Sequence, residues 1–123
     1  MRASDDTRVL FTAIEESTRN VYEIPTLGGQ PRLLRRAARN ARYSPGGKWL
    51  AYIAIGARES LRVVPTDGGA ERALATDLVD IASATWSDGG RHLLVVAHPD
   101  PSVELDCWII ALEGGTPLDT GVM

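Results

Sequence analysis

Residue types that bind metals are few in this sequence and lie far apart. His92 and His98, the two histidines, are separated by six positions and lie near Asp100 and the single cysteine, Cys107. Six residues of an extended strand span about 20 Å, whereas zinc holds three or four ligands at about 2 Å. Both histidines of one chain therefore cannot bind one ion, and we predict no metal site.

A nucleophilic side chain needs a base and an electropositive setting, and the sequence supplies neither beside its candidates. Cys107 precedes Trp108 in an apolar stretch, where a free cysteine is typically a small buried hydrophobe. Ser44 and Ser87 lie in polar turns without a Gly-x-Ser-x-Gly pattern. No Gly-Lys-Ser/Thr phosphate loop occurs. We predict no catalytic residue and no cofactor for this chain.

Aromatic side chains are better candidates for binding. Tyr43 and Trp86 occupy matching places, each directly before a serine that opens a polar turn. Tyrosine and tryptophan combine an apolar body with a polar tip, which suits contact with a small ligand or a protein. The alternative is that both pack within the core, as aromatic residues at strand positions usually do.

A second candidate surface is basic. Four arginines are predicted to form a patch for an anion or a protein partner: Arg35, Arg36, Arg39 and Arg42. The alternative is a solvated outer edge of a sheet, where charges discourage unwanted strand pairing.

Composition limits the classes of protein that remain. The chain has 123 residues, 44% hydrophobic and 24% charged, with a formal net charge of −3, which is typical of one soluble globular domain. No apolar run approaches the roughly 20 residues of a membrane-spanning helix. The acidic balance gives no indication of nucleic-acid binding. The first residues lack the apolar core of a secretory signal, and one cysteine excludes an intrachain disulfide.

An internal repeat organises the chain. Three segments each contain a polar turn and then an apolar run, with a basic residue between them, and they begin at Ser4, Ser44 and Ser87. A glycine pair follows in each unit, at 28–29, 68–69 and 114–115. The serines lie 40 and 43 residues apart and the glycine pairs 40 and 46. This is the period of a four-stranded propeller blade.

The apolar runs have the composition of strands that are buried on both faces. Residues 48–55 and 93–97 are short and rich in β-branched and aromatic side chains. Their apolar character is continuous rather than alternating, which indicates that another sheet covers each face. We therefore predict an all-β fold of three four-stranded antiparallel propeller blades, at about 1–38, 39–78 and 79–123.

Within each blade, the glycine pair is expected to close a hairpin, and a more polar outer strand follows. The innermost strands are predicted at 41–44 and 84–87, and the first unit retains only 1–4 of this strand. Residues 31–38 also have helical spacing. The repeat register favours a strand there, followed by a loop through Asn40.

These motifs resemble the TolB-type β-propeller repeat. In that repeat an aromatic residue precedes Ser-Pro-Asp-Gly, a basic residue and an apolar strand, and Gly-Gly and Leu-Thr follow. Residues 43–52, YSPGGKWLAY, and 86–93, WSDGGRHL, both fit, and 73–76, ALAT, supplies the closing element. The family's Asp is Gly46 here and its Pro is Asp88; both positions shape a turn.

The resemblance implies a bacterial propeller of six to eight blades in complete members, on the periplasmic or extracytoplasmic side. It implies a non-catalytic interaction or scaffold module that binds a protein or a small ligand at the channel mouth. The alternative is a sensor or gating propeller attached to a bacterial signalling kinase or peptidase, whose catalytic domain lies elsewhere.

Three blades form an open arc, which leaves one apolar sheet face bare at each end. Such faces are larger than monomers usually expose. We expect the last blade of one chain to pack on the first blade of another, so that a head-to-tail homodimer closes six blades, or a trimer nine. The alternative is an excised piece of a longer chain. Neither nucleic acid nor membrane insertion is expected.

Overall fold

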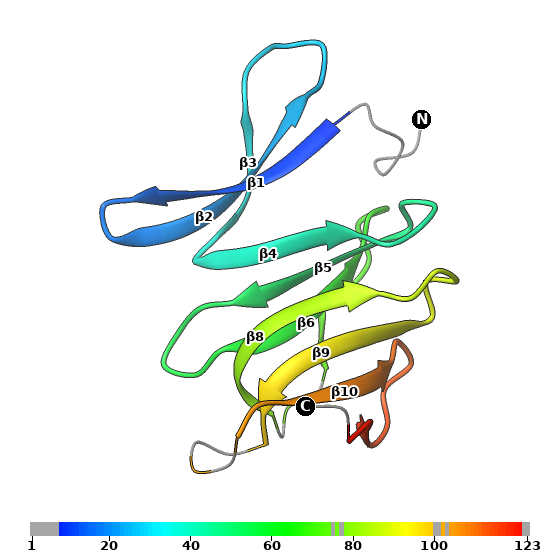
Figure 1. The fold of residues 1–123 in the computed structure, drawn as a ribbon. Helices are drawn as coiled ribbons and strands as arrows, with labels where there is room; N and C mark the ends of the chain where they lie inside the picture. The colour runs from blue at the N-terminus through cyan, green and yellow to red at the C-terminus, as the bar shows by residue number, and fades with distance from the viewer. Residues whose placement is uncertain (1–7, 75, 77, 100–101, 103, 122–123) are drawn as a thin grey trace.

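The computed structural model describes residues 8–74, 76, 78–99, 102 and 104–121. In this part of the chain, eleven strands form three antiparallel sheets, and no helix is present that is long and apolar enough to cross a membrane. The sheets are stacked in chain order (Figure 1). The predicted all-β fold is confirmed.

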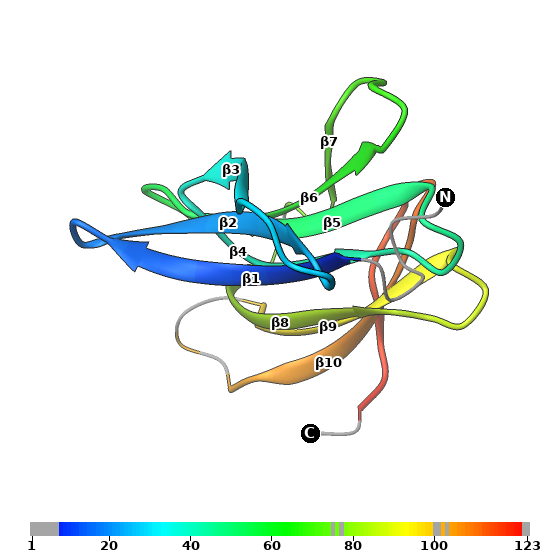
Figure 2. The same ribbon diagram turned by 90° about the horizontal axis from the view of Figure 1, so that it is seen from above.

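The strands follow one another in each sheet as they do in the sequence. The first sheet contains β1 (Arg8–Glu15), β2 (Thr18–Pro25) and β3 (Arg32–Arg36). The second contains β4 (Ala38–Tyr43), β5 (Trp49–Ala54), β6 (Ser60–Pro65) and β7 (Arg72–Leu74). The third contains β8 (Val79–Trp86), β9 (His92–His98), β10 (Asp106–Ala111) and β11 (Leu118–Asp119). In the view from above, the outer strands β3 and β7 project on the same side (Figure 2).

The glycine pairs close equivalent hairpins in all three sheets. In each, the amide of the first glycine donates to the carbonyl three residues earlier, at 3.1, 3.2 and 2.9 Å. These glycines have φ of +96°, +101° and +100°, a region that a side chain with a Cβ rarely enters. They are Gly28, Gly68 and Gly114.

The serine turns repeat with the same hydrogen bonds. Ser44 Oγ accepts from the amide of Trp49 at 3.0 Å, and Ser87 Oγ accepts from the amide of His92 at 3.2 Å. The amide of each serine also donates to the carbonyl of the same partner, at 2.8 Å in both turns. The predicted role of these serines, bonding to turn backbone, is confirmed.

The apolar core lies between the sheets. One cluster joins the second and third sheets and includes Ile53, Leu61 and Val95, each fully buried. A smaller cluster of Val21, Ala38 and Tyr52 joins the first and second sheets. Four consecutive residues of β5, 50–53, are buried, so the central sheet is covered on both faces as the sequence predicts.

Asn40, at the junction between the first and second blades, differs from the expectation. Asn40 does not belong to a loop: β3 ends at Arg36, Ala37 turns the chain with φ of +49°, and β4 begins at Ala38. Asn40 lies within a bulge of β4 with φ of +55°, a conformation that asparagine tolerates better than most residues. The predicted remnant strand at 1–4 lies outside the described residues.

The two serine turns form a matched pair for a stability test. Ser44 is 2% exposed, so replacing it with alanine leaves the Trp49 amide without its partner in a buried turn. We expect Ser44→Ala to lower the free energy of unfolding by about 1–3 kcal/mol. Ser87 lies in the more exposed turn, where water can replace the hydroxyl. Ser87→Ala should therefore lower the free energy of unfolding by less. Urea denaturation checks both, and equal losses would contradict this account.

Candidate functional site

Tyr43 and Trp86 lie at equivalent ends of the inner strands β4 and β8. The Tyr43 hydroxyl donates to the carboxylate of Glu23, in β2 of the preceding sheet. Trp86 Nε1 donates to the backbone carbonyl of Arg42, also in the preceding sheet, at 3.0 Å. Each aromatic residue therefore connects its own blade to the blade before it. Ligand binding by this pair stays a prediction.

Glu23 is the centre of a polar cluster between the first two sheets. It is 4% exposed and forms ion pairs with Arg8 at 3.3 Å and Arg32 at 3.0 Å. Burial and then the hydrogen bond to Glu23 raise the pKa of Tyr43 to about 12. Ionisation of the phenol would place a second negative charge beside this carboxylate, so Tyr43 stays a hydrogen-bond donor.

A cleft of about 330 Å³ brings Tyr43 and Arg35 together between β3 and the second sheet. The Arg35 guanidinium lies 3.5 Å from the Glu71 carboxylate and 5.5 Å from the centre of the Tyr52 ring. Arg32 also lines this cleft. Because Glu23 and Glu71 pair with these two arginines, carboxylates balance the positive charge at the cleft.

The four arginines of the predicted basic patch are divided between two sheets. Arg35 and Arg36 belong to the outer strand β3, whereas Arg39 and Arg42 belong to the inner strand β4. Arg39 donates twice to Glu59, at 3.0 Å each, and also to two backbone carbonyls of β8. Its guanidinium therefore joins the second and third blades. Binding of an anion or a partner by these residues stays a prediction.

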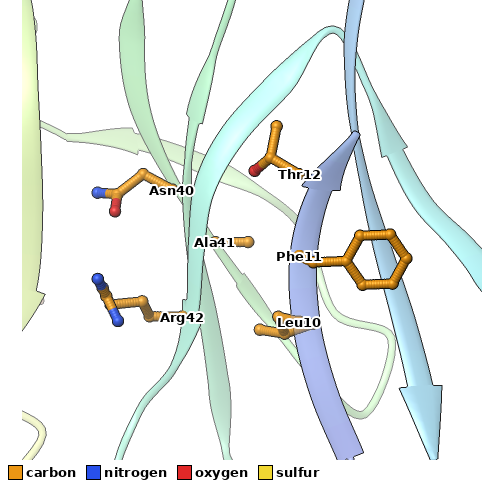
Figure 3. A pocket seen from close by; sticks show the side chains of 6 residues that line it. All are labelled: Leu10, Phe11, Thr12, Asn40, Ala41 and Arg42. Atoms are coloured by element: carbon orange, nitrogen blue, oxygen red, sulfur yellow. The ribbon is translucent and has the colours of Figure 1, made fainter. Parts of the chain in front are cut away.

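A groove of about 190 Å³ lies between β1 and β4 (Figure 3). It is lined by Leu10, Phe11, Thr12, Asn40, Ala41 and Arg42. Sequence reasoning missed this groove, because it is formed by two strands of different repeats. The alternation of apolar side chains along one strand carries no information about the neighbouring blade.

The outer face of the third blade carries an apolar hollow of about 490 Å³, and Trp86 contributes to its lining. Leu94 and Ile109, opposite each other on β9 and β10, form its apolar wall. Among the described residues, Tyr43 and Trp86 therefore border different hollows.

The end blades expose apolar positions that the central blade buries. Strands β1, β5 and β9 are equivalent, because each pairs with the strand that precedes the glycine-pair hairpin of its blade. Aligned on these hairpins, Val9 and Phe11 match Leu50 and Tyr52, and Leu94 matches Ala51. Leu50 and Tyr52 are each 5% exposed and Ala51 is 2% exposed. In contrast, Val9 is 47%, Phe11 37% and Leu94 43% exposed. Both end faces thus have the apolar character of an interface between blades.

Residues considered for metal or nucleophile chemistry are not gathered. His92 and His98 lie at opposite ends of β9, and Cys107 is buried in β10. Asp100 lies outside the described residues. Among residues 8–121, apart from the few positions left undescribed, no group of three or more potential metal ligands occurs.

Three stacked antiparallel sheets, packed face to face through apolar clusters and linked by hydrogen bonds from the aromatic residues of β4 and β8, are consecutive blades of a β-propeller. No model of a known protein family matches the sequence, and no curated protein does either. The blades superpose on TolB from Acinetobacter baumannii with a TM-score of 0.80 at 19% identity, over 96% of this chain and 30% of that chain.

Two further solved structures share this fold. The putative TolB from Agrobacterium tumefaciens gives a TM-score of 0.77 at 14% identity, over 96% of this chain and 46% of that chain. The β-propeller domain of the Trilobed protease from Pyrococcus furiosus gives 0.65 at 20% identity, over 86% and 35%. The chain thus spans less than half the length of each, and its fold is that of a TolB-like propeller segment.

The raised pKa of Tyr43 predicts a pH dependence of stability. The folded chain holds the phenolic proton up to about pH 12, whereas an unfolded tyrosine loses it near pH 10. The stability from this group is therefore fully present below pH 10 and is lost as the pH rises from about 10 to 12. The stability of the Tyr43→Phe variant should therefore fall less steeply between pH 10 and 12 than that of the wild type.

Urea denaturation at several pH values, with tyrosinate absorbance as a second readout, measures this effect. Tyr22→Phe is the comparison variant, since Tyr22 donates to Glu15 on the surface of the first blade. The hydrogen bond to Glu15 also raises the pKa of Tyr22, but to a smaller extent, so Tyr22→Phe should reduce the loss of stability between pH 10 and 12 less than Tyr43→Phe does. An unchanged slope in Tyr43→Phe would contradict the assigned role of the Glu23 cluster.

Proposed function

We propose that this chain is a non-catalytic β-propeller interaction module, which closes a ring with a second copy of itself and binds a protein or small ligand at the channel mouth. The observation that carries this proposal is the pair of uncovered end faces. Val9 and Phe11 on one end, and Leu94 on the other, occupy positions that a neighbouring blade buries elsewhere in the same chain.

The distribution of charge supports a head-to-tail contact between copies. Residues 8–36, the first blade, contain five arginines and three glutamates. Residues 79–119, the third blade, contain seven acidic residues and one basic residue, Arg91. Opposite net charges favour docking of a third blade on a first blade, and like charges disfavour contact between two third blades. Two copies then supply six blades, and three would supply nine.

The channel mouth is the proposed binding surface because the inner strands end there. Tyr43 and Trp86 end β4 and β8, and each has one polar atom engaged with the preceding blade. Their rings are only partly buried, so aromatic surface remains available for contact. Residues on a rigid scaffold, next to its loops, are common recognition sites.

A second candidate function is a sensor or gating propeller of a longer protein with a catalytic domain elsewhere. The similarity to the propeller domain of a protease favours this candidate. A kinase or peptidase motif encoded in frame beside this segment would support it, and such a protein would supply the neighbouring blades itself.

Mass in solution tests closure by self-association. Sedimentation at micromolar concentration should give twice 13.3 kDa for the six-bladed ring. Leu94→Lys places a charge on the end face and should shift the chain toward monomer, by about tenfold or more in the dissociation constant. A mass of three times 13.3 kDa would indicate a trimer with nine blades instead of a dimer with six.

Leu27→Lys is the matched control, because Leu27 is 100% exposed in the turn between β2 and β3 and carries the same change of charge. It should leave the mass unchanged. A stable wild-type monomer, or equal effects of the two lysine variants, would overturn the proposed closure.

A further inference from the structure

We propose that the cleft between β3 and the second sheet binds the C-terminal residue of a partner protein, with its carboxylate on two arginines and its apolar side chain on the floor. The lining residues lie between Arg32 and Gly69 in the sequence, so one chain provides all of them, whether or not copies close a ring. This inference adds a site to the proposed function. Tyr43 borders both surfaces, whereas the arginines of the cleft have no part in the channel-mouth surface proposed above.

A β-bulge places two arginines on the same face of β3. Arg32 lies opposite Glu23 on β2. Arg35 lies opposite Val21, and the pairing shifts by one residue in between. Because residues two apart on β2 share a face, the two arginines opposite them share one as well. In a regular strand, residues three apart would point to opposite faces, so the bulge directs both guanidinium groups into the cleft.

Hydrogen bonds and ion pairs hold both guanidinium groups in place within the free chain. Arg35 donates to the Leu34 carbonyl at 2.8 Å and lies 3.5 Å from the Glu71 carboxylate. Arg32 donates to the buried Glu23 carboxylate at 3.0 Å. The Arg32 side chain is nevertheless 67% exposed, so its guanidinium remains accessible to a ligand. Groups that are ordered beforehand lose less entropy on binding.

Positive charge exceeds negative charge around the cleft. Four arginines form ion pairs with two glutamates there: Arg8 and Arg32 with Glu23, and Arg35 and Arg62 with Glu71. The glutamates offset the two arginines that line the cleft and leave the other two unmatched. Asp67, which accepts from the Gly69 amide at 3.3 Å, offsets one more. A single carboxylate would neutralise the remaining charge, and arginine binds carboxylates with two parallel hydrogen bonds.

The floor of the cleft is apolar. Leu50 and Val64 line it although they are only 5% and 8% exposed, so they form its base rather than its rim. The volume of about 330 Å³ is at the low end for ligand sites and favours a short segment. A C-terminal residue carries a carboxylate and a side chain on one carbon, and its chain leaves the cleft in one direction only. An acidic residue within a chain would need two exits.

The internal repeat indicates that the fold does not require these arginines. Aligned on the glycine pairs, Arg72 and Leu118 take the place of Arg32 in the second and third blades. Arg72 donates to the Leu112 carbonyl at 2.8 Å and lies 5.3 Å from the centre of the Trp49 ring, so it binds within the chain. Leu118 carries no charge at all. A pair of accessible, pre-ordered guanidinium groups therefore exceeds what packing of blades needs.

The probe is the acetylated dipeptide acetyl-Ala-Leu with a free carboxylate, titrated into the full chain. Amide NMR resonances of Gly68 and Gly69, at the edge of the cleft, should shift on binding. The same dipeptide with a C-terminal amide should bind about tenfold or more weakly, because the charge-assisted hydrogen bonds are lost. Acetyl-Ala-Gly should also bind more weakly, because no side chain covers the apolar floor.

Arg32→Gln tests the site within the protein and should weaken binding about tenfold or more. Glu23 keeps Arg8 and Tyr43 as partners in this variant, so the junction between the blades is retained. Arg19→Gln is the matched control: it removes the same charge from an exposed residue at the other end of β2 and should bind the dipeptide like the wild type.

Any of three results would refute the inference: equal binding of the carboxylate and the amide, equal effects of the two glutamine variants, or tighter binding of inorganic phosphate or acetate than of the dipeptide. Binding that survives Arg32→Gln and shifts Trp86 instead would assign the dipeptide to the channel mouth. Mass separates this site from ring closure. A monomer that binds the dipeptide refutes only closure, and a dimer that does not bind it refutes only the cleft.

Discussion

A sheet that is apolar on both faces is stable in water only when both faces are covered, and this requirement shapes the whole chain. The central blade meets it: residues 50–53 of β5 are buried in succession, with Tyr52 in the cluster shared with the first sheet and Ala51 and Ile53 in the cluster shared with the third. Burial of apolar surface contributes roughly 25 cal/mol per Å². The stacked order of the sheets follows from this requirement, and so does the apolar character of the outer faces of the first and third blades.

Polar contacts then fix how each blade is placed on its neighbour. Apolar contact is non-directional, whereas Arg39 binds Glu59 and two carbonyls of β8 at the same time. The Trp86 indole and the Tyr43 phenol add one directed hydrogen bond to each junction. The side chains that sequence patterns single out as binding candidates thus also determine the geometry between blades.

The fold was predictable because the repeat signals are local. The serine turns and glycine hairpins recur with the same backbone hydrogen bonds, and each can be identified within a few residues. The division of the arginine cluster was not predictable, because the left-handed residue Ala37 separates β3 from β4 and sends neighbours in sequence to different sheets. The groove between β1 and β4 and the Glu23 cluster also depend on contacts between repeats, which the spacing within one repeat does not encode.

The two ends of the arc are different surfaces, so the proposed contact between copies would have no intrinsic stopping point. Each such contact would cover the third-blade face of one copy and the first-blade face of the next, and would leave one face of each kind free. The rotation from one sheet to the next therefore decides the outcome: if the accumulated turn reaches a full circle the assembly is finite, and if it falls short or overshoots the same contact propagates a filament. Small changes at the junction residues, such as Arg39, act on that rotation directly.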